Sequence, residues 1–375
     1  MAKDIFSFGN IYRCYLNCRK NKRNTINALK FELNAEENIL RLEKELKSKV
    51  YHPSRSILFF VKKPKLREIF AADFRDRVVH HILVGYLEPI LENVFIHDSY
   101  SCRKGKGTHR AVMRLQSFIR KVSKNGKARP YYLQLDIKSF FTNMDKEILF
   151  SLIGRRTRNK DILWLAGTII FYDCTRNYIL RGRADLFNEL SCEKSLFGKE
   201  NKRGVPIGNL TSQFFANVYL NELDQFVKHR LRCRYYIRYA DDFVLLDNSR
   251  EKLAGWMEGI KGFLESELKL NLNYRRIKLR PVSDGIDFVG YVVRRDYILV
   301  RRRVVNNMNR KLQYFEQHRY NSLNHEMLEN LRSSVQSYLG HFKWANSYRL
   351  VKRLVENKVI SAYFKMVGYR LVPRY

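Results

Sequence analysis

Residues 235–246 form the stretch Tyr235-Tyr236-Ile237-Arg238-Tyr239-Ala240-Asp241-Asp242-Phe243-Val244-Leu245-Leu246. Its two arms are rich in aromatic and β-branched residues, which favour strands, whereas acidic residues normally avoid strand interiors. The pattern therefore predicts a hairpin that presents Asp241 and Asp242 as metal ligands at its tip. An ordinary polar turn is the alternative for this stretch taken alone.

A second apolar stretch also ends in a carboxylate, in the run Tyr131-Tyr132-Leu133-Gln134-Leu135-Asp136. If the two stretches are neighbouring strands, Asp136 meets Asp241 and Asp242, and three crowded carboxylates repel one another unless hard divalent cations neutralise them. Two Mg²⁺ ions roughly 3.5–4 Å apart, with Mn²⁺ as an alternative, would stabilise the attacking and leaving oxygens of phosphoryl transfer. Nucleotidyl transfer is therefore the predicted chemistry.

The composition predicts a folded protein that binds a polyanion. The 375 residues include 71 Lys and Arg against 37 Asp and Glu, the formal charge is +34, and 45% of the residues are hydrophobic. This hydrophobic content can fill a large core, and positive charge spread along the whole length suits a nucleic acid that crosses several subdomains. A membrane-surface protein is the alternative, but no single basic amphipathic helix dominates the sequence.

The sequence also bears on where the protein works. Residues 1–8 lack an apolar signal core, and the longest apolar stretch, Ile162 to Tyr172, is too short to span a bilayer. The six cysteines form no Cys-x-x-Cys pair, so reduced thiols are expected rather than a zinc ribbon or a disulfide framework. We therefore expect a cytoplasmic protein with no membrane partner.

Hydrophobic periodicity outlines the remaining elements. Helices are expected over 34–50, 75–93 and 109–122, after Asn209, from Glu251, and throughout the chain from about 300 onward, including 323–339 and 348–367. A strand pair is expected at 56–61 and 66–70, joined by a basic turn over residues 62–65. Residues 155–204 form a polar, partly irregular insertion, and the basic glycine segment 103–108 is either an anion-binding helix start or a plain connecting loop.

Four motifs follow one another in a familiar order: Asp136, then Gly204-Val205-Pro206-Ile207-Gly208-Asn209-Leu210-Thr211-Ser212-Gln213, then the Asp241-Asp242 hairpin, then Phe288-Val289-Gly290-Tyr291. Over about residues 55–295 the chain resembles a reverse transcriptase palm. The resemblance implies an α+β right-hand polymerase fold, with fingers, a palm of antiparallel sheet plus helices, and a helical thumb. The expected domains are an N-terminal extension and fingers over 1–120, a palm over 121–295 with part of the fingers and the 155–204 insertion, and a helical thumb over 296–375.

The resemblance also implies roles for single residues. Asp136, Asp241 and Asp242 correspond to the catalytic, metal-binding carboxylates, and the backbone carbonyl of Ile137 is a further metal ligand. The residues implied at the incoming deoxynucleoside triphosphate are Lys65, Arg67, Phe141, Ile207, Gly208 and Gln213. Those implied at the primer and template are Tyr239, Phe288, Gly290 and Tyr291.

Several of these residues have a plainer interpretation. Arg67, which would clamp the triphosphate with its guanidinium fork, could instead belong with Lys65 to a solvated basic turn. Phe141, which would exclude a 2′-hydroxyl and so favour DNA synthesis, could be a core aromatic, and Phe140 beside it could share either role. The stretch from Phe288 to Tyr291 could be a core strand.

Departures from the common pattern narrow the resemblance. Many reverse transcriptases have glutamine at Ile207, and group II intron enzymes have Ser-Pro at Ser212-Gln213. With the run Asp76-Arg77-Val78-Val79-His80-His81, these changes resemble reverse transcriptases of diversity-generating retroelements. Members of that family copy a template-repeat RNA, misincorporate opposite adenines and work with a small basic oligomeric accessory protein. Like charges repel, so we expect such a protein to dock on a local acidic or apolar patch or through shared RNA, and the Glu-rich helix from Asn34 to Val50, with Glu36, Glu37 and Glu43, is a candidate face.

Two alternatives and one uncertainty in the site stay open. A group II intron-like or other bacterial reverse transcriptase is the nearer alternative, and a non-catalytic RNA-binding scaffold with a polymerase fold is the remote one. Template RNA, primer and cDNA are the expected partners. At Arg276 the family often has a lysine proposed as the general acid for pyrophosphate release. Arginine is a poor proton donor, so either Lys278 serves or charge stabilisation suffices.

Overall fold

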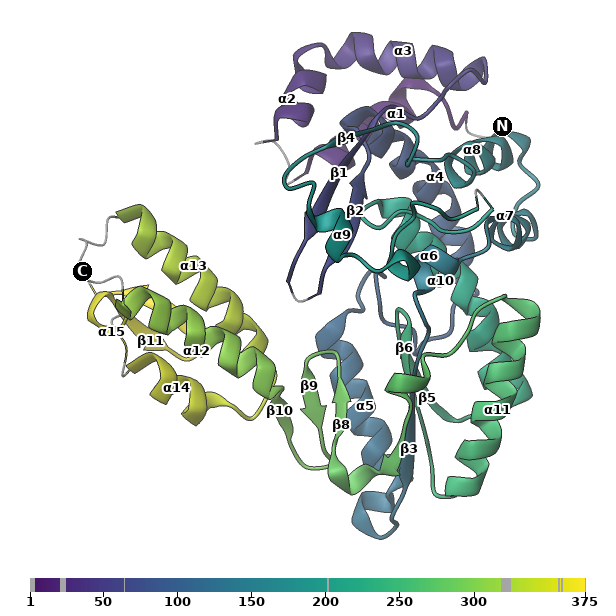
Figure 1. Ribbon diagram of the computed structural model, residues 1–375. Coiled ribbons are helices and arrows are strands. Elements are labelled where there is room, and N and C mark those ends of the chain that lie inside the picture. Colours follow the sequence, from purple (N-terminus) through teal and green to yellow (C-terminus); the bar gives the residue numbers. More distant parts are fainter. Residues whose placement is uncertain are drawn as a thin grey trace.

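The computed structural model describes residues 4–20, 25–63, 65–200, 202–317, 325–356, 358 and 360–374. Small, mostly antiparallel sheets are combined with many helices, which confirms the predicted α+β class. Figure 1 shows the purple N-terminal helices at one end of the molecule and the yellow-green C-terminal helices as a separate arm. Among the described residues, every helix is too short or too polar to cross a membrane.

The central sheet contains four antiparallel strands in the order β5-β6-β3-β7: Tyr235–Tyr239 (β5), Asp242–Asp247 (β6), Tyr131–Asp136 (β3) and Lys278–Pro281 (β7). Leu133 and Leu245 pack in the core shared with α10 (Leu210–Gln225) and α11 (Arg250–Glu267). Tyr132 and Val244 point to the other face and pack with α5 (Thr108–Val122). Both faces are therefore buried, which explains why these strands have unbroken apolar runs.

A second sheet lies above the first in Figure 1 and joins β1 (Ser56–Val61) to β2 (Arg67–Ala71) and β4 (Tyr178–Leu180) in the order β2-β1-β4. The basic turn between β1 and β2 is present as expected, although Pro64 lies outside the described residues. Helix α4 (Phe74–Glu92) follows β2 and begins at Asp73, whose carboxylate accepts from the Arg75 backbone N–H.

The segment from 155 to 204 is partly irregular, as expected, but it also contains elements that were not predicted from the sequence. It contains α8 (Lys160–Ile170), which begins after the N-cap Asn159 and buries Ile162, Leu165, Ala166 and Ile170, together with β4, which pairs parallel to β1. The run noted in the sequence as too short for a membrane is therefore a core helix. Shorter elements nearby are α6 (Phe140–Asn143), α7 (Lys146–Gly154), α9 (Leu186–Glu189) and η2 (Cys192–Lys194).

Three helices precede β1: α1 (Phe8–Arg19), α2 (Ile26–Leu33) and α3 (Ala35–Lys47). Ile11 and Tyr15 of α1 and Ile39 of α3 are buried in the same core as α4. This N-terminal layer covers the side of α4 that would otherwise be exposed, so α4 is apolar on more than one face. The expected helix over 34–50 is found, ending three residues early.

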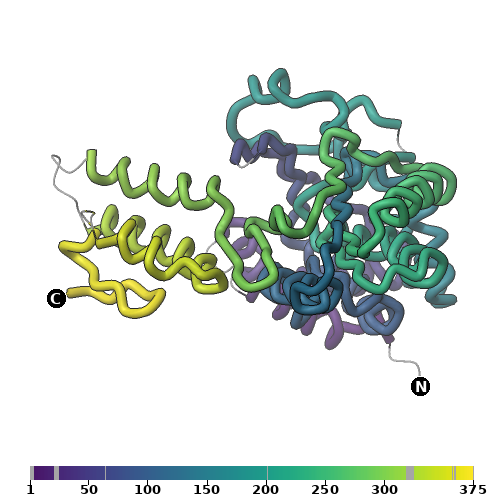
Figure 2. Tube along the Cα trace, turned by 90° about the horizontal axis from the view of Figure 1, so that it is seen from below, coloured from purple at the N-terminus to yellow at the C-terminus, as the bar shows by residue number. Residues whose placement is uncertain are grey.

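The chain leaves the central sheet through a small antiparallel sheet of β8 (Ile286–Phe288), β9 (Tyr291–Val293) and β10 (Ile298–Val300). The C-terminal arm follows, with α12 (Arg302–Gln317), α13 (His325–Phe342), α14 (Tyr348–Glu356) and α15 (Ile360–Tyr363). Figure 2 shows these helices packed together and projecting from the rest of the molecule. The start of the helix expected over 323–339 lies outside the described residues.

The expectation that the chain is helical throughout from 300 onward is wrong at its end. Residues 364–373 form an antiparallel hairpin of β11 (Phe364–Val367) and β12 (Arg370–Pro373). Gly368 has a φ of 59°, a left-handed conformation that suits the tight two-residue turn between these strands. Leu371 of this hairpin is buried against the arm, so tertiary packing favours the strand pair over helix.

Candidate active site

The three carboxylates predicted from sequence lie together at one end of the central sheet. Asp136 ends β3 and pairs in register with Asp242, which begins β6, and Asp242 also pairs with Tyr239 at the end of β5. Between β5 and β6, Ala240 has a φ of 55°. The carbonyl of Asp241 accepts a hydrogen bond of 3.3 Å from the Ile137 N–H. Strand register therefore brings the side chains of residues about one hundred positions apart to the same edge.

The charges of these groups are strongly coupled. Burial, followed by repulsion from Asp136, raises the pKa of Asp241 to about 6, and the positive charges of Arg67 and Arg238 act in the opposite direction. Burial raises the pKa of Asp242 to about 7, against the hydrogen bond from Gln134 and with repulsion from Asp241 and Asp136. Burial also raises the pKa of Asp136. Each carboxylate thus resists ionisation unless a positive charge is supplied.

Neighbouring polar side chains hold two of the three carboxylates. Asp136 accepts from Asn273 Nδ2 and from Arg276 Nη1, each at 2.9 Å. Asp242 accepts from Gln134 Nε2 at 3.0 Å. Gln134 interrupts an apolar strand two residues before Asp136, so its polarity was a usable signal in the sequence. Asn273 gave no comparable signal.

The donor set fits hard divalent cations, because it consists of carboxylate oxygens whose mutual repulsion a cation would relieve. Within the described residues, no group of three or more His, Cys, Asp or Glu side chains is arranged to hold a metal ion in this conformation. Asn273 and Arg276 occupy both oxygens of Asp136, so a cation there would displace Arg276. Metal binding by the carboxylates and Ile137 therefore stays a prediction.

The second sheet contributes a cation to the same region. Along β2 the side chains alternate, with Glu68 buried and Arg67 exposed. Glu68 accepts from the Ser195 hydroxyl and the Leu196 N–H, which fixes the inner face of the strand. Arg67 on the outer face lies near enough to lower the pKa of Asp241 by its charge. Lys65 is exposed in the turn before β2.

The glycine-containing segment after residue 204 is fastened to β2. The Phe70 N–H donates to the Ile207 carbonyl at 2.9 Å, and the Ala72 N–H donates to Asn209 Oδ1 at 3.0 Å. Gly208 has a φ of 124°, and a Cβ there would lie 2.8 Å from Ile69 Cγ2, so the close approach needs glycine. Gln213 is exposed on α10.

The two adjacent phenylalanines differ in burial. Phe140 is buried in the core, whereas Phe141 is only partly buried and packs at the edge of that core, with the two ring centroids 5.3 Å apart. Ser139, just before them, has a φ of 48°, which turns the chain away from β3. Phe141 is therefore the ring of the two that retains an accessible face.

The side chains of Phe288 and Tyr291 are fully buried, as in the plainer interpretation of this stretch. The Tyr291 hydroxyl donates to the His341 carbonyl at 2.8 Å, and its ring stacks on His341 at 4.2 Å, which fastens β9 to α13. Any contact with a primer here falls to the turn at Val289 and Gly290, which has positive φ at both residues. Tyr239 is partly exposed and its hydroxyl lies 3.1 Å from Thr108 Oγ1.

An antiparallel sheet that carries three carboxylates at one edge, a strand pair that carries a cation near them, and a projecting helical arm are the features of a right-hand nucleic acid polymerase. The family model described as reverse transcriptase (RNA-dependent DNA polymerase) matches residues 61–293, so the chain belongs to that family. Its domain is that of an RNA-directed DNA polymerase.

Curated relatives agree with this assignment. Protein YkfC of Escherichia coli (strain K12) is 27% identical over 288 residues, which cover 67% of this chain and 69% of that protein. The group II intron-encoded protein LtrA of Lactococcus lactis subsp. cremoris is 23% identical over 325 residues, covering 69% of this chain and 50% of LtrA. The chain thus spans about half the length of LtrA.

The fold is also similar to solved structures. Apo telomerase from Candida tropicalis is 12% identical, with a TM-score of 0.52 and coverage of 81% of this chain and 55% of that chain. The telomerase of the same organism in complex with a TWJ fragment of telomeric RNA has a TM-score of 0.50. At this identity the likeness establishes the polymerase fold alone.

Proposed function

We propose that this protein is an RNA-directed DNA polymerase that extends a primer on an RNA template with deoxynucleoside triphosphates. The observation that carries the proposal is the meeting of Asp136, Asp241 and Asp242 at one edge of the central sheet, with Arg67 near enough to lower the pKa of Asp241 by its charge. A scaffold that only binds RNA has no use for three carboxylates whose repulsion opposes folding. The formal charge of +34 suits a template and primer.

In the proposed reaction the primer 3′-hydroxyl attacks the α-phosphate in line and pyrophosphate leaves. Asp136, Asp241, Asp242 and the Ile137 carbonyl would hold two Mg²⁺ ions, which when bound supply Lewis-acid stabilisation of the phosphates. Arg67 and Lys65 bind the triphosphate, and Phe141 excludes a 2′-hydroxyl. Gly208 lets the chain approach the nascent pair, next to Ile207 and Gln213. The backbone turn at Gly290, together with Tyr239, supports the primer.

Primer extension tests the activity directly. On a defined RNA template with Mg²⁺, the wild-type protein should extend a DNA primer with deoxynucleotides and discriminate against ribonucleotides. Phe141→Ala should admit ribonucleotides without changing base choice, and Phe140→Leu is the matched control because Phe140 lies in the core. If the protein bound the template without extending the primer, the non-catalytic RNA-binding scaffold would be the remaining interpretation.

The finer proposal is a reverse transcriptase of a diversity-generating retroelement, which copies a template-repeat RNA with errors at adenines. Its support is Ile207, since an isoleucine offers no amide to align the nascent pair, and loss of a polar anchor loosens geometric selection. Ser212-Gln213 in place of Ser-Pro points the same way. A group II intron-like reverse transcriptase is the second candidate, and its support is the similarity to LtrA.

Error frequency per template base separates these candidates. In cDNA from the wild-type protein, errors should concentrate opposite adenines. Ile207→Gln should lower that frequency several-fold, because one well-placed hydrogen bond contributes on the order of 1 kcal/mol. Ile207→Leu is the matched control and should leave the frequency unchanged. Accurate copying of adenines by the wild type would favour the group II intron-like candidate.

The retroelement proposal includes a small basic oligomeric accessory protein. The Glu-rich helix α3 offers less for its docking than the sequence indicated, because Glu43 accepts from the Phe8 N–H and from Lys47. Glu36 and Glu37 remain exposed, although Arg41 pairs with Glu37 at 3.0 Å. Charge reversal at Glu36 and Glu37 should weaken the complex, and unchanged complex formation would exclude this face.

A further inference from the structure

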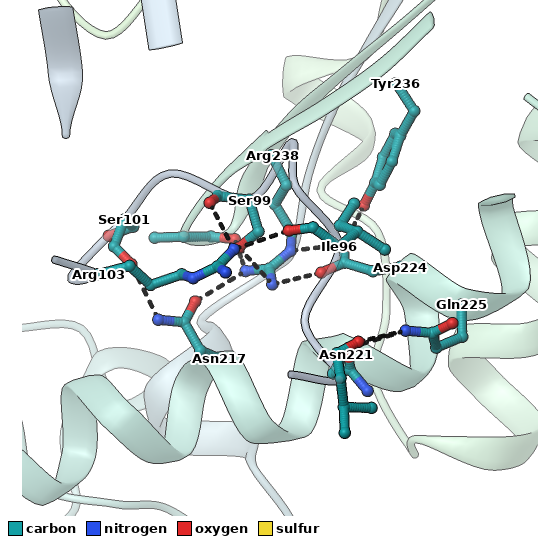
Figure 3. Close-up of polar contacts among 12 residues, drawn as sticks. Ile96, Ser99, Ser101, Arg103, Asn217, Asn221, Asp224, Gln225, Tyr236 and Arg238 are labelled. Carbon is teal, nitrogen blue, oxygen red and sulfur yellow. Dashed lines mark hydrogen bonds and ion pairs between the residues drawn. The ribbon is translucent and has the colours of Figure 1, made fainter. Parts of the chain in front are cut away.

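A fully buried ion pair lies beneath the catalytic hairpin. Arg238 is on β5, three residues before Asp241, and Asp224 is on α10, and neither side chain is exposed to solvent. Arg238 Nε and Nη2 donate to the two carboxylate oxygens of Asp224 at 2.7 and 2.6 Å, and the Tyr236 hydroxyl donates to the same carboxylate at 2.7 Å. Figure 3 shows how these side chains converge from the strand and the helix.

The remaining donors of this guanidinium reach the catalytic turn and the loop beside it. Nη1 donates to the Ala240 carbonyl at 3.1 Å and to Asn217 Oδ1 at 3.4 Å, while Nη2 also donates to Ser99 Oγ at 3.1 Å. A guanidinium has five N–H donors, and here five acceptors surround it. Lysine has three donors at a single point and could not reach these groups together.

The bond to Ala240 matters because of the backbone conformation at that residue. Ala240 has a φ of 55°, a left-handed conformation that alanine rarely adopts, and its peptide leads directly into Asp241. Such a conformation persists only where surrounding contacts hold it. Arg238 supplies a charge-assisted hydrogen bond to the one carbonyl that fixes the orientation of this peptide.

The same network fastens the hairpin to the segment before α5. The Arg238 N–H donates to the Asp98 carbonyl and the Tyr100 N–H to the Arg238 carbonyl, both at 3.0 Å, so residues 98–100 extend the edge of the sheet beside β5. Arg103 donates to the Ile96 and Ser99 carbonyls at 2.7 and 2.9 Å. Arg103 thus attaches the start of the basic glycine segment 103–108 to the loop that pairs with β5.

We infer that Arg238 is a positioning residue that, together with Asp224, holds the strained Ala240 turn so that Asp241 and Asp242 face Asp136. This inference rests on the proposed polymerase function. Stability alone does not account for the pair, since replacing a buried ion pair by apolar residues is often neutral or stabilising. The match of donors to acceptors, including the bond from Nη1 to the Ala240 carbonyl, accounts for it.

The first test compares Arg238→Lys with Tyr236→Phe. Both remove hydrogen bonds to buried Asp224, but only Arg238→Lys removes the bond to the Ala240 carbonyl. We expect Arg238→Lys to lower kcat about 10²-fold, with the template-primer Kd unchanged, because small misplacements of catalytic groups have effects of that size. Tyr236→Phe should lower Tm and leave kcat within about twofold. The inference would be wrong if Tyr236→Phe and Arg238→Lys lowered kcat equally for the same loss of Tm, because loss of stability would then explain both.

The double variant Arg238→Met, Asp224→Leu keeps the test decisive if Arg238→Lys does not fold. It removes both charges and fills the space with apolar side chains, but it leaves the Tyr236 hydroxyl and the Ala240 carbonyl without these partners, so its Tm should be closer to that of the wild type than the Tm of Arg238→Met alone. Its kcat should still be about 10²-fold lower. A folded double variant with wild-type kcat would show that the charge pair does not position the turn.

A second measurement separates this inference from the proposed function. Mn²⁺ affinity, followed by electron paramagnetic resonance, should fall about tenfold or more in Arg238→Lys, as is usual when groups that orient metal ligands are removed. Arg75→Met removes a half-buried arginine in the first turn of α4, outside the central sheet, where it pairs with Glu45, and should leave the affinity unchanged. A wild-type protein without polymerase activity would contradict the proposed function, whereas unchanged Mn²⁺ affinity in Arg238→Lys would contradict the positioning role.

Discussion

The central sheet and the C-terminal arm bury different kinds of side chain. Beneath the hairpin that carries Asp241 and Asp242, the buried Arg238 donates hydrogen bonds to two other buried side chains, Asp224 and Asn217. In the arm, among the described residues from 296 onward, Ser347 is the single buried polar side chain, and the interior is formed by residues such as Met308, Leu312 and Leu339. The sheet uses directional contacts that fix positions, whereas the arm uses packing that holds helices together and leaves its charges outside. The proposed chemistry needs groups held in fixed positions, whereas the proposed binding of a polyanion by the arm needs only exposed positive charge.

The largest expected effect comes from the carboxylates themselves. Asp136→Asn and Asp241→Asn remove one charge each with almost no change in volume, so nucleotide incorporation should fall below about a thousandth of the wild-type rate. RNA affinity, measured by filter binding, should stay within about twofold because the basic surface is intact. Substantial polymerisation by both variants would show that these carboxylates are not the catalytic centre.

This contrast also explains what could be predicted from sequence. The Asp241-Asp242 hairpin and Asp136 were readable because acidic residues interrupt strand patterns, and the register of β3 with β6 then brings them together. The pairing of Arg238 with Asp224 could not be predicted, since nothing in the sequence distinguishes a buried arginine in a strand from an exposed one. The pairing depends on α10 lying beside β5, which brings together Asp224 and Arg238, fourteen positions apart in the chain.

The errors in the arm and in residues 155–204 have a different physical origin. In the last residues, helical periodicity competed with a tight turn at Gly368, and packing of Leu371 decided for a hairpin. In residues 155–204, the apolar stretch within α8 was considered only as a membrane span because charged residues surround it, whereas its side chains complete the core around α4 and α7. Local composition predicts solvent exposure poorly where a short helix is buried along only one stripe.

Arg67 should give the next largest effect, because it is the cation of the second sheet that reaches the carboxylates by its charge. Arg67→Ala should raise the KM for deoxynucleotides and lower kcat/KM about 10²-fold, through loss of a charged fork at the triphosphate. Steady-state kinetics on a homopolymer template would measure this. Lys62→Ala is the matched control, since Lys62 is exposed in the turn that leads to β2 and its Nζ lies 3.8 Å from Glu189 Oε1. Equal kinetic effects of the two changes would exclude a special role for Arg67.

The arm should respond to mutation in a different way from the sheet. Arg302 and Arg303 are exposed at the start of α12, so changing both to Gln should weaken template-primer binding about tenfold and reduce the salt slope by about one for each phosphate that is no longer neutralised. The rate at saturating template-primer should not change. Lys352→Gln is the control, because Glu356 lies 3.6 Å from Lys352 and already balances its charge. A fall in the saturated rate would mean that the arm also positions reacting groups.

The smallest expected effect is on stability and depends on pH. Because Asp241 and Asp242 have pKa values raised to about 6 and about 7, the folded protein binds more protons than the unfolded chain between about pH 4 and pH 7. In metal-free protein their contribution to stability therefore falls as pH rises through this window. Asp242→Asn removes one such group and keeps an oxygen for the Gln134 N–H.

Thermal unfolding at several pH values measures this contribution as a difference between the two proteins, which cancels the titration of all other groups. The Tm values of the metal-free wild type and Asp242→Asn should be closest near pH 4.5, and at pH 7.5 the variant should be more stable by a few degrees, because a carboxyl pKa raised from 3.8 to about 7 corresponds to a few kcal/mol and each kcal/mol moves the Tm by about 1 °C in a chain of this length. Mg²⁺ should then raise the Tm of the wild type at pH 7.5 and have little effect at pH 4.5, because protons and cations compete for the same oxygens. Parallel curves of Tm against pH for the two proteins would show that the crowding of carboxylates at this edge does not affect stability. The contrast between a sheet that buries charged groups and an arm with an apolar interior would then have no thermodynamic support.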